Sequence, residues 1–375
     1  MIVFEAVHAK FGDALLLRYE QGRQQRLWII DGGPAGIWKN FLKPRLGQLR
    51  GGAETLTVDL AMLSHVDDDH VNGVLQMIGG IAENRPGAAT WLDIRRFWHN
   101  SFADLVGSED AVKAGQASLA GLEQGARAAM AGAGTLAVAG GKLRSHRELA
   151  VLASIGQGRE LRDYLVQLKL EGNSPFDDVL SSTSGHRDID GAKVTVLGPR
   201  APRLAALRKA WRNAAGSPAA VAGLFRDDLD DSVPNLSSLV LLVEIGKRKI
   251  LLTGDARGDD IVAGLKDAMP DVELPMKVDI LKMPHHGSDR NMTETFLQSF
   301  PADHYVISAD GTFGNPEDNT LRAIVASRGP GEDYTIHLTN AIGRLQQLLP
   351  EISEGHAFKF AVRGAQDLSV AITLP

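Results

Sequence analysis

Two histidines and three aspartates fall within six consecutive residues of this chain, and this cluster constrains the fold more than any other feature. The apolar run Leu56–Ser64 before the cluster predicts a buried strand, and the apolar spacing of Val71–Ile78 after it predicts a helix. The potential metal ligands in the loop between them are His65, Asp67, Asp69 and His70. Side chains of this kind repel one another when unneutralised, whereas divalent cations neutralise them and fix their geometry. The segment is read either as a metal site or as a solvated acidic turn.

Two further strand ends carry potential ligands. The apolar run Lys249–Leu252 leads through a Thr-Gly turn to Asp255, and the run Ile280–Met283 leads through a proline to His285 and His286. Each pattern alone is weak, because Gly-Asp commonly ends strands for conformational reasons and a histidine pair is more often surface or hydrogen-bonded structure. Together, three strand ends that present ligands favour a metal site.

Composition limits the chemistry that such a site can use. The chain contains no cysteine, which excludes disulfides, thiol nucleophiles and thiolate ligands, so a metal ion must be held by His, Asp or Glu. The net charge of −6 gives no global attraction to nucleic acid, although a local basic groove can exist within an acidic total. The first residues predict a strand rather than a signal peptide, and no window resembles a membrane span. We therefore expect a cytoplasmic protein with no membrane association.

The rest of the chain alternates between strand and helix patterns. A hairpin is predicted from two strands over 13–19 and 25–30, a mainly helical insertion over about 101–170, and a last strand pair from Phe358–Val362 and Leu368–Leu374. Further strands are predicted at 193–197, 238–245, 249–252 and 278–283, and further helices at 204–211, 261–269 and 293–300. This alternation predicts an α/β fold in which helices cover the sheets.

The order of the three motifs resembles the metallo-β-lactamase superfamily. The motifs are His-x-Asp-x-Asp-His, then Thr-Gly-Asp, then Pro-His-His-Gly-Ser, and the turn Asp31–Gly33 belongs to the same pattern. Within the superfamily, the chain is most similar to the hydrolase domain of the bacterial DNA-uptake competence channel, which also has Asp where most relatives have a second His. The resemblance implies one domain over residues 1–375, a four-layer αββα sandwich of the metallo-β-lactamase type, with the helical insertion at about 101–170.

The resemblance also implies a dinuclear site. His65 and Asp67 would hold the first metal ion, Asp69 and His70 the second, Asp255 would bridge the two, and His286 would complete the second, with His285 as the alternative for that role. The mid-chain histidine of the family has no counterpart, because the segment 234–238 carries Pro-Asn-Leu-Ser-Ser where it is expected. Exchange of His for Asp makes the first site harder, so the two divalent ions are expected to be Zn²⁺ or Mn²⁺.

The expected activity is metal-dependent hydrolysis of a phosphodiester in nucleic acid. Three carboxylates against two divalent cations leave about one positive charge, which stabilises a hydroxide and attracts an anionic substrate oxygen. Asp69 is expected to be essential, and His285 or a water to protonate the leaving group. Candidate nucleic-acid contacts are Arg95, Arg96, Arg203, Arg208, Lys209, Arg212, Lys247, Arg248 and Lys249. Solvated helix faces and a basic hairpin turn explain these residues equally well.

Two alternatives stay open at this point. The same metal centre serves many chemistries, so the substrate could be a small ester, a lactone or a phosphocholine-like compound. The missing mid-chain ligand could also mean a degenerate site in a binding or scaffold protein. Metal content separates the second alternative from an enzyme, and activity on a panel of substrates separates the first from a nuclease.

Overall fold

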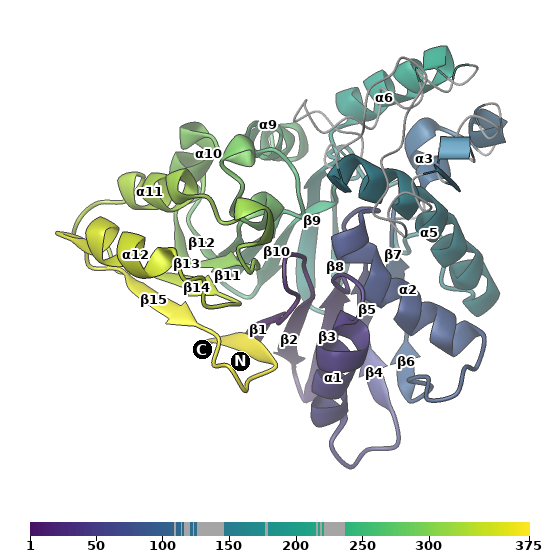
Figure 1. Ribbon diagram of the computed structural model, residues 1–375, viewed down its shortest axis with the longest axis horizontal. Helices are drawn as coiled ribbons and strands as arrows, with labels where there is room; N and C mark the ends of the chain where they lie inside the picture. The colour runs from purple at the N-terminus through teal and green to yellow at the C-terminus, as the bar shows by residue number, and fades with distance from the viewer. Residues whose placement is uncertain are drawn as a thin grey trace.

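A six-stranded and an eight-stranded sheet form the centre of the computed structural model (Figure 1). The structure describes residues 1–108, 110–113, 115, 121–122, 124–125, 146–176, 179–214, 217, 220 and 237–375, without the side chains of 146–155. The six-stranded sheet has the order β16-β1-β2-β3-β5-β7. Its strands are β1 (Ile2–Val7), β2 (Leu15–Gln21), β3 (Gln24–Ile30), β5 (Leu60–Met62), β7 (Phe97–Trp98) and β16 (Ser369–Leu374).

The eight-stranded sheet has the order β15-β14-β13-β12-β11-β10-β9-β8. Its strands are β8 (His186–Ile189), β9 (Ala192–Gly198), β10 (Val240–Ile245), β11 (Arg248–Leu252), β12 (Val278–Lys282), β13 (Ala302–Ile307), β14 (Thr335–Leu338) and β15 (Lys359–Val362). Strands β8 to β11 pair antiparallel, whereas β11 to β15 pair parallel. The carboxyl ends of the parallel strands therefore meet at one edge, where α/β proteins usually bind ligands.

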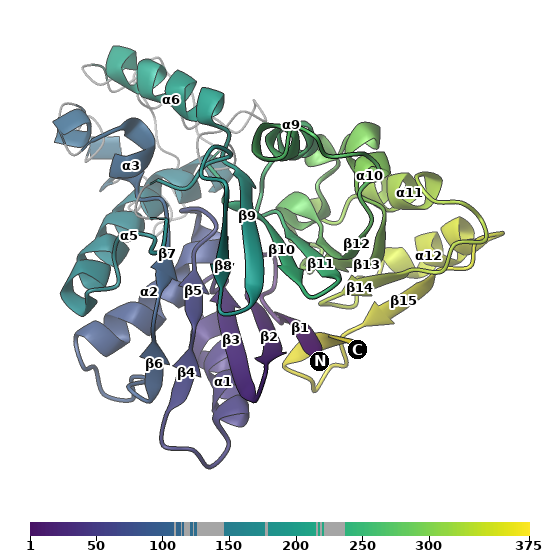
Figure 2. The same cartoon turned by 180° about the vertical axis from the view of Figure 1, so that it is seen from behind.

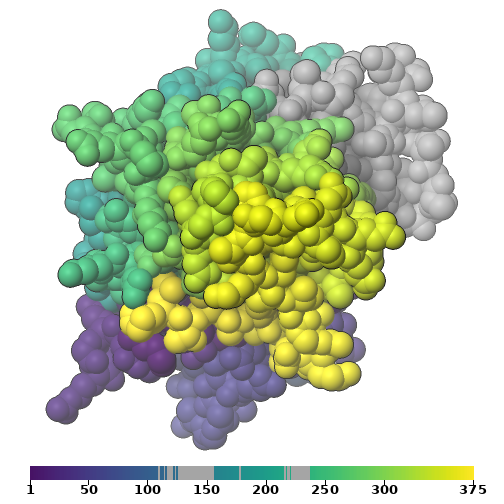
Figure 3. Space-filling model, turned by 90° about the vertical axis from the view of Figure 1, so that its left-hand side faces the viewer, coloured from purple at the N-terminus to yellow at the C-terminus, as the bar shows by residue number. Residues whose placement is uncertain are grey.

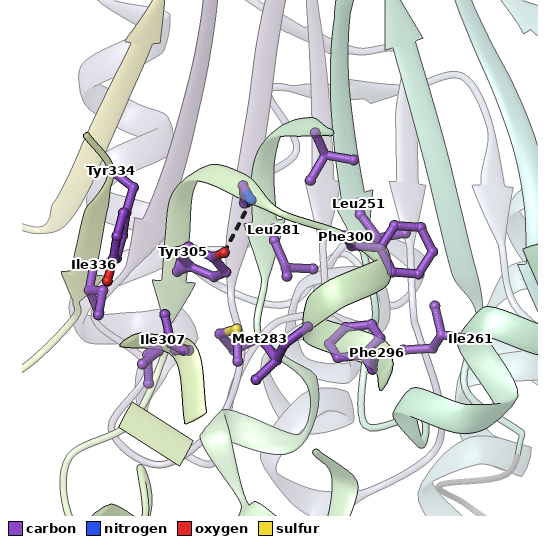
Figure 4. Close-up of a cluster of buried hydrophobic side chains, with 14 of the residues drawn as sticks. Leu251, Ile261, Leu281, Met283, Phe296, Phe300, Tyr305, Ile307, Tyr334 and Ile336 are labelled. Atoms are coloured by element: carbon purple, nitrogen blue, oxygen red, sulfur yellow. Dashed lines mark hydrogen bonds between the residues drawn. The ribbon is translucent and has the colours of Figure 1, made fainter. Parts of the chain in front are cut away.

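Helices cover the outer face of each sheet. The helices α1 (Lys43–Arg50), α2 (Asp68–Ala82) and α5 (His146–Leu168) lie on the six-stranded side, and α9 (Gly258–Ala268), α10 (Glu294–Ser299), α11 (Asp318–Ala326) and α12 (Leu345–Ser353) lie on the other (Figures 1 and 2). One apolar core lies between the sheets, and one lies under each helical layer. Met283, Phe296 and Tyr305 belong to the core under α9–α12 (Figure 4). The protein is thus a four-layer αββα sandwich, as predicted.

The predicted strand Leu56–Ser64 is wrong in its extent. It divides into β4 (Leu56–Val58), which pairs with β6 (Leu92–Ile94) in a separate two-stranded sheet, and β5, which pairs with β3. Asp59 separates the two pieces. Its carboxylate accepts hydrogen bonds from the Leu27 amide at 3.0 Å and from Arg26 at 2.8 Å, and this tertiary contact breaks the run.

The last two strands are not a pair, contrary to the sequence prediction. Strand β15 pairs parallel with β14 at the edge of the eight-stranded sheet, while β16 pairs antiparallel with β1 in the other sheet. The alternate residues Val370, Ile372 and Leu374 of β16 face the core between the sheets, which draws this strand away from β15. The yellow C-terminal segment consequently lies against the purple N-terminal part of the molecule (Figure 3).

Two described helices, α3 (Phe102–Val106) and α5, lie in the segment predicted as a helical insertion, and most of the remainder falls outside the described residues. Helix α6 (Ala201–Ala214) joins them from later in the chain. Its Trp211 ring packs edge to face on Phe102 at 5.0 Å and donates a hydrogen bond to the Ala111 carbonyl at 2.7 Å. Within the described residues, no helix has the length and apolar character needed to cross a membrane.

Candidate metal centre

The predicted ligands follow the ends of β5 in one sheet and of β11 and β12 in the other. Strand β5 ends at Met62, and the loop that follows carries His65 and Asp67. Helix α2 begins at Asp68, so Asp69 and His70 lie in its first turn and not in the loop where the sequence had indicated them. Strand β11 leads to Gly254, whose φ of 51° turns the chain so that Asp255 points inward. Strand β12 leads to His285 and His286, both in the left-handed region with φ of 49° and 55°. Non-glycine residues adopt this conformation rarely, and they concentrate at functional sites.

The carboxylate of Asp255 is the common point of four imidazoles. Its Oδ1 lies 3.4 Å from Nε2 of His70, and its Oδ2 lies 3.9, 3.6 and 3.5 Å from Nε2 of His65, His285 and His286. The Asp69 carboxylate lies 3.2 Å from Nε2 of His286. Two ligand atoms bound at about 2.1 Å to one tetrahedral ion stand roughly 3.4 Å apart. The spacing therefore fits metal ions shared among these atoms.

The other ring nitrogen of each histidine contacts an outer partner. The Nδ1 atoms lie 3.1 Å from Ser64 Oγ for His65, 2.9 Å from Asp31 Oδ2 for His70, 2.6 Å from Asn291 Oδ1 for His285 and 3.1 Å from Ser308 O for His286. Metal-binding histidines are held in this way, because the outer contact fixes both the tautomer and the direction of the ring. All four rings are thus oriented with Nε2 toward the centre.

Burial supplies an independent test of the fit. His65 and Asp255 are 3% and 1% exposed. Neither Nε2 of His65 nor Oδ1 of Asp255 has a hydrogen-bond partner within the described part of the chain. An unsatisfied buried polar group costs about 1–3 kcal/mol, so two such atoms beside each other need a ligand. A divalent cation satisfies an imidazole nitrogen and a carboxylate oxygen together, and the residues present fit such ions.

Charges at the centre favour metal coordination. Burial, together with the neighbouring His70, lowers the pKa of His65 to about 3, so this ring is neutral. Burial opposes ionisation of Asp69, but His70 and His286 outweigh it and lower the pKa of Asp69 to about 2. Burial also opposes a charge on His70, yet Asp255 and Asp69 outweigh it and raise the pKa of His70 well above its usual value. Metal binding would displace the proton from such a ring.

Asp13 and Lys282 belong to the site but were not predicted. Asp13, in the loop before β2, is 1% exposed, and its Oδ1 lies 3.5 Å from Nδ1 of His286. The buried Lys282 Nζ lies 2.7 Å from the other oxygen. Burial opposes ionisation of Asp13, but Lys282 outweighs it and holds the pKa of Asp13 below its usual range. One ligand atom each of Asp13, His70, Asp255 and His286 lie within 4.8 Å of one another. The available signal was a lone lysine in a buried strand, which requires a buried acid.

Asp67 caps a helix, and the 234–238 segment is described only at its end. Asp67 is the N-cap of α2, where its Oδ1 accepts a hydrogen bond from the Asp68 amide at 3.0 Å. Residues 234–236, in the segment where the resemblance predicts a mid-chain histidine, lie outside the described residues. Ser238, at its end, accepts a hydrogen bond from the Asp255 amide at 3.2 Å. This contact fixes the backbone of the central carboxylate.

Five of the nine basic residues considered for nucleic-acid binding contact acidic or carbonyl partners within the fold. Arg96 pairs with Asp190 at 2.6 Å, and Arg248 pairs with Asp279 at 2.8 Å. Arg248 begins β11, whereas Asp255 follows its end, and five strand residues span roughly 16 Å. Arg96 directly precedes β7 in the same way. These two arginines therefore lie at the sheet edge opposite the centre.

Arg203, Arg208 and Arg212 lie on α6, whereas Arg95 directly precedes Arg96 and pairs with Asp59 at 3.6 Å. Arg203 pairs with Asp260 at 3.2 Å, and Arg208 donates hydrogen bonds to the carbonyls of Asp104 and Leu105 at 3.0 and 3.3 Å. The sequence allowed a structural role for these residues as readily as nucleic-acid binding, and these contacts are structural. They supply no basic groove at the metal centre.

A cavity of about 290 Å³ lies between β7 and α5. Its lining includes Phe97, His99, Arg162 and Leu165 and none of the candidate metal ligands. His99 follows β7 and is buried.

Comparison with known proteins gives little beyond this geometry. No protein-family model matches the chain, and no curated protein matches it. The crystal structure of the metallo-beta-lactamase fold protein YhfI from Bacillus subtilis is similar over 99% of both chains, with 12% sequence identity and a TM-score of 0.38. A similarity this low carries no argument, so the fold rests on the observed sheets and the site on its own geometry.

Proposed function

We propose that this protein is a metal-dependent hydrolase with a dinuclear centre. One observation carries the proposal: four imidazoles direct Nε2 at the Asp255 carboxylate over 3.4–3.9 Å, and each is oriented through Nδ1 by an outer partner. A solvated acidic turn would not bury these groups, and it would not orient four rings on one carboxylate.

The ligands divide into two groups around Asp255. His65, Asp67 and His285 would hold the first ion, and Asp69, His70 and His286 the second. His285 thus takes the place of the absent mid-chain histidine, instead of serving as the proton donor that the sequence indicated. Nδ1 of His285 contacts Asn291 at 2.6 Å, and Nε2 points toward Asp255 at 3.6 Å, where it would bind the ion. Neither ring nitrogen is then available to donate a proton to a leaving group.

Bound divalent ions would supply Lewis acidity and a water of lowered pKa. The chain's own residues orient and neutralise the ligands. Asp31 fixes the ring of His70, Asn291 fixes that of His285, and Lys282 matches the charge of Asp13. The Asp69 side chain is 20% exposed, while the imidazoles of His65 and His70 are fully buried, so substrate approaches from the side of Asp69.

A phosphodiester is the substrate class that this charge favours. Asp67, Asp69 and Asp255 against two divalent ions leave about one positive charge, which attracts an anionic oxygen more than a neutral carbonyl. This sum counts the ligands alone: Lys282 balances the charge of Asp13, and Asp31 lies behind His70, where its carboxylate accepts hydrogen bonds from Ser64 and His70. We propose a diester of nucleic acid as substrate, with a small ester or lactone as the alternative outcome.

The test combines metal content with a substrate panel. Protein reconstituted with Zn²⁺ or Mn²⁺ should contain two ions per chain and hydrolyse bis-p-nitrophenyl phosphate. Asp69→Asn should abolish turnover, while Asp68→Asn, a change in the adjacent carboxylate that contacts Asn72, should not. Absence of bound metal would refute the centre, and turnover of a lactone or β-lactam without any diester would refute the substrate class.

A separate variant tests the position of His285. His285→Ala should lower the metal content from two ions to one, because a ligand of the first ion is lost. A proton donor would behave differently, since its removal would leave two ions bound and lower only the turnover. Elemental analysis beside the kinetics therefore decides between the two roles, and two bound ions in the variant would contradict ours.

A further inference from the structure

Two aromatic side chains, the exposed Phe313 and the partly buried Phe11, meet on loops that contact residues of the metal centre. Phe313 is 57% exposed, and its ring meets that of Phe11 edge to face at a centroid distance of 5.3 Å. The two residues come from opposite ends of the chain, one from the loop before β2 and the other from the loop after β13. Because exposure of a large aromatic side chain gains nothing for folding, the pair calls for another explanation.

Both loops are attached to the metal centre. Phe11 is two residues before Asp13, and the intervening Gly12 carbonyl accepts a hydrogen bond from Ser308 Oγ at 2.6 Å. The Ser308 carbonyl contacts Nδ1 of His286 at 3.1 Å. At the other end of the Phe313 loop, the Asn315 side chain donates a hydrogen bond to the His285 carbonyl at 3.4 Å. The loops that carry the two rings are therefore joined by hydrogen bonds to the segment that carries the histidine ligands.

The backbone of Phe313 is strained, and its surroundings hold it so. Its φ of 63° lies in the left-handed region, which bulky residues rarely enter. Asp310 accepts a hydrogen bond from the Thr312 amide at 2.9 Å, and Arg344 donates one to the Gly314 carbonyl at 2.6 Å. A strained residue that its neighbours hold firmly is typical of functional sites. Glycine would be free of this strain, so the phenylalanine ring is present here at a conformational cost.

We propose that Phe313 and Phe11 form a stacking surface for unpaired nucleobases of a single-stranded nucleic acid whose phosphodiester lies at the metal centre. This inference rests on the proposed function and names its substrate. Proteins that bind single strands stack bases on aromatic rings and contact the backbone with cations. Lys10, which is exposed and directly precedes Phe11, supplies a cation. Duplex nucleic acid, whose bases are already stacked, would not use this surface.

The test compares bases with no bases on an otherwise identical backbone. Binding of labelled, hydrolysis-resistant phosphorothioate dodecamers is followed by fluorescence anisotropy, using oligothymidine, oligouridine, an abasic strand and a duplex. The parent protein should bind the thymidine or uridine strand about ten-fold more tightly than the abasic strand, since stacking contributes about 1–3 kcal/mol per base. The two base-carrying strands distinguish DNA from RNA.

Variants assign the difference to the rings. Phe313→Gly should remove the preference for bases and raise the melting temperature, because glycine relieves the strain at φ 63°. Phe11→Ala should reduce the preference as well. Val166→Ala, which truncates an apolar side chain of similar exposure (51%) on α5, should change neither quantity.

The outcomes separate this inference from the proposed function. Equal binding of base-carrying and abasic strands by the parent, or an unchanged preference in Phe313→Gly, would overturn the stacking surface. Turnover of bis-p-nitrophenyl phosphate is measured in parallel, so loss of base preference with intact turnover refutes only the surface. Base preference without turnover of any diester would keep the surface and refute the hydrolase.

Discussion

Asp31→Asn is the sharpest test of how the outer contacts control the metal centre. Asp31 is 1% exposed, and its two oxygens accept three hydrogen bonds: Oδ1 from the Ser64 amide at 2.6 Å, and Oδ2 from Ser64 Oγ at 2.7 Å and from His70 Nδ1 at 2.9 Å. Asparagine keeps the size and tolerates the φ of 58° at this position. Asparagine has only one acceptor oxygen, however, so it loses either the hydrogen bond at the Oδ1 position or those at the Oδ2 position.

Either orientation of the amide has a definite cost. With its oxygen at the Oδ2 position, the amide NH₂ faces the Ser64 N–H and a charge-assisted hydrogen bond of about 1.5–3 kcal/mol is lost. With its oxygen at the Oδ1 position, the NH₂ faces Nδ1 of His70. That ring must then carry its proton on Nε2, which blocks coordination. We expect a loss of about 2 kcal/mol in the free energy of unfolding and a 10- to 100-fold weaker affinity for one of the two ions.

Asp59→Asn is the matched control. Asp59 is also 1% exposed, and it accepts hydrogen bonds from Arg26 and the Leu27 amide. Both donors lie on β3, and neither is a proposed metal ligand. Its variant should lose stability and keep the metal affinity of the parent. Chelator competition and urea unfolding measure the two quantities. If Asp31→Asn binds both ions as tightly as the parent, the carboxylate does not orient His70.

Three further variants test the structure around the site. Lys282→Met leaves Asp13 buried without its cation, so urea unfolding should show a loss of about 3–5 kcal/mol. Burial opposes ionisation of Glu5, but hydrogen bonds from Arg45 and other donors outweigh it and lower the pKa of Glu5. The ionised Glu5 therefore stabilises the fold above the unfolded-state pKa of 4.5, and this stabilisation is lost as the pH falls through the folded-state pKa. Glu5→Gln should flatten the acid limb of stability measured by urea unfolding against pH. Gly73→Ala places a Cβ 1.9 Å from the Gly32 carbonyl, so α2 must shift, and both melting temperature and metal content should fall.

Local patterns were sufficient to predict the ligand-bearing strand ends. Apolar runs that stop at Thr-Gly-Asp or at Pro-His-His can be recognised without the rest of the chain. The apolar spacing after His70 likewise predicted most of α2. The division of Leu56–Ser64 could not be predicted, since it depends on contacts of Asp59 with β3. The partner of β16 could not be predicted either, because strand pairing between chain ends leaves no local signal.

The contacts behind the ligands were hidden for a related reason. Asp31 contacts His70, and Asp13, which pairs with Lys282, contacts His286; in each case the partners are far apart in the sequence. A sequence shows which side chains can bind a metal ion, but the residues that hold those side chains are defined only once the strands are ordered. In this fold β3 and β5 are neighbours and parallel, so the turn at Asp31 after β3 meets the start of α2, which carries His70. Sheet order therefore converts a set of capable residues into an oriented centre, and for this reason Asp31→Asn tests the proposal more stringently than removal of a ligand would.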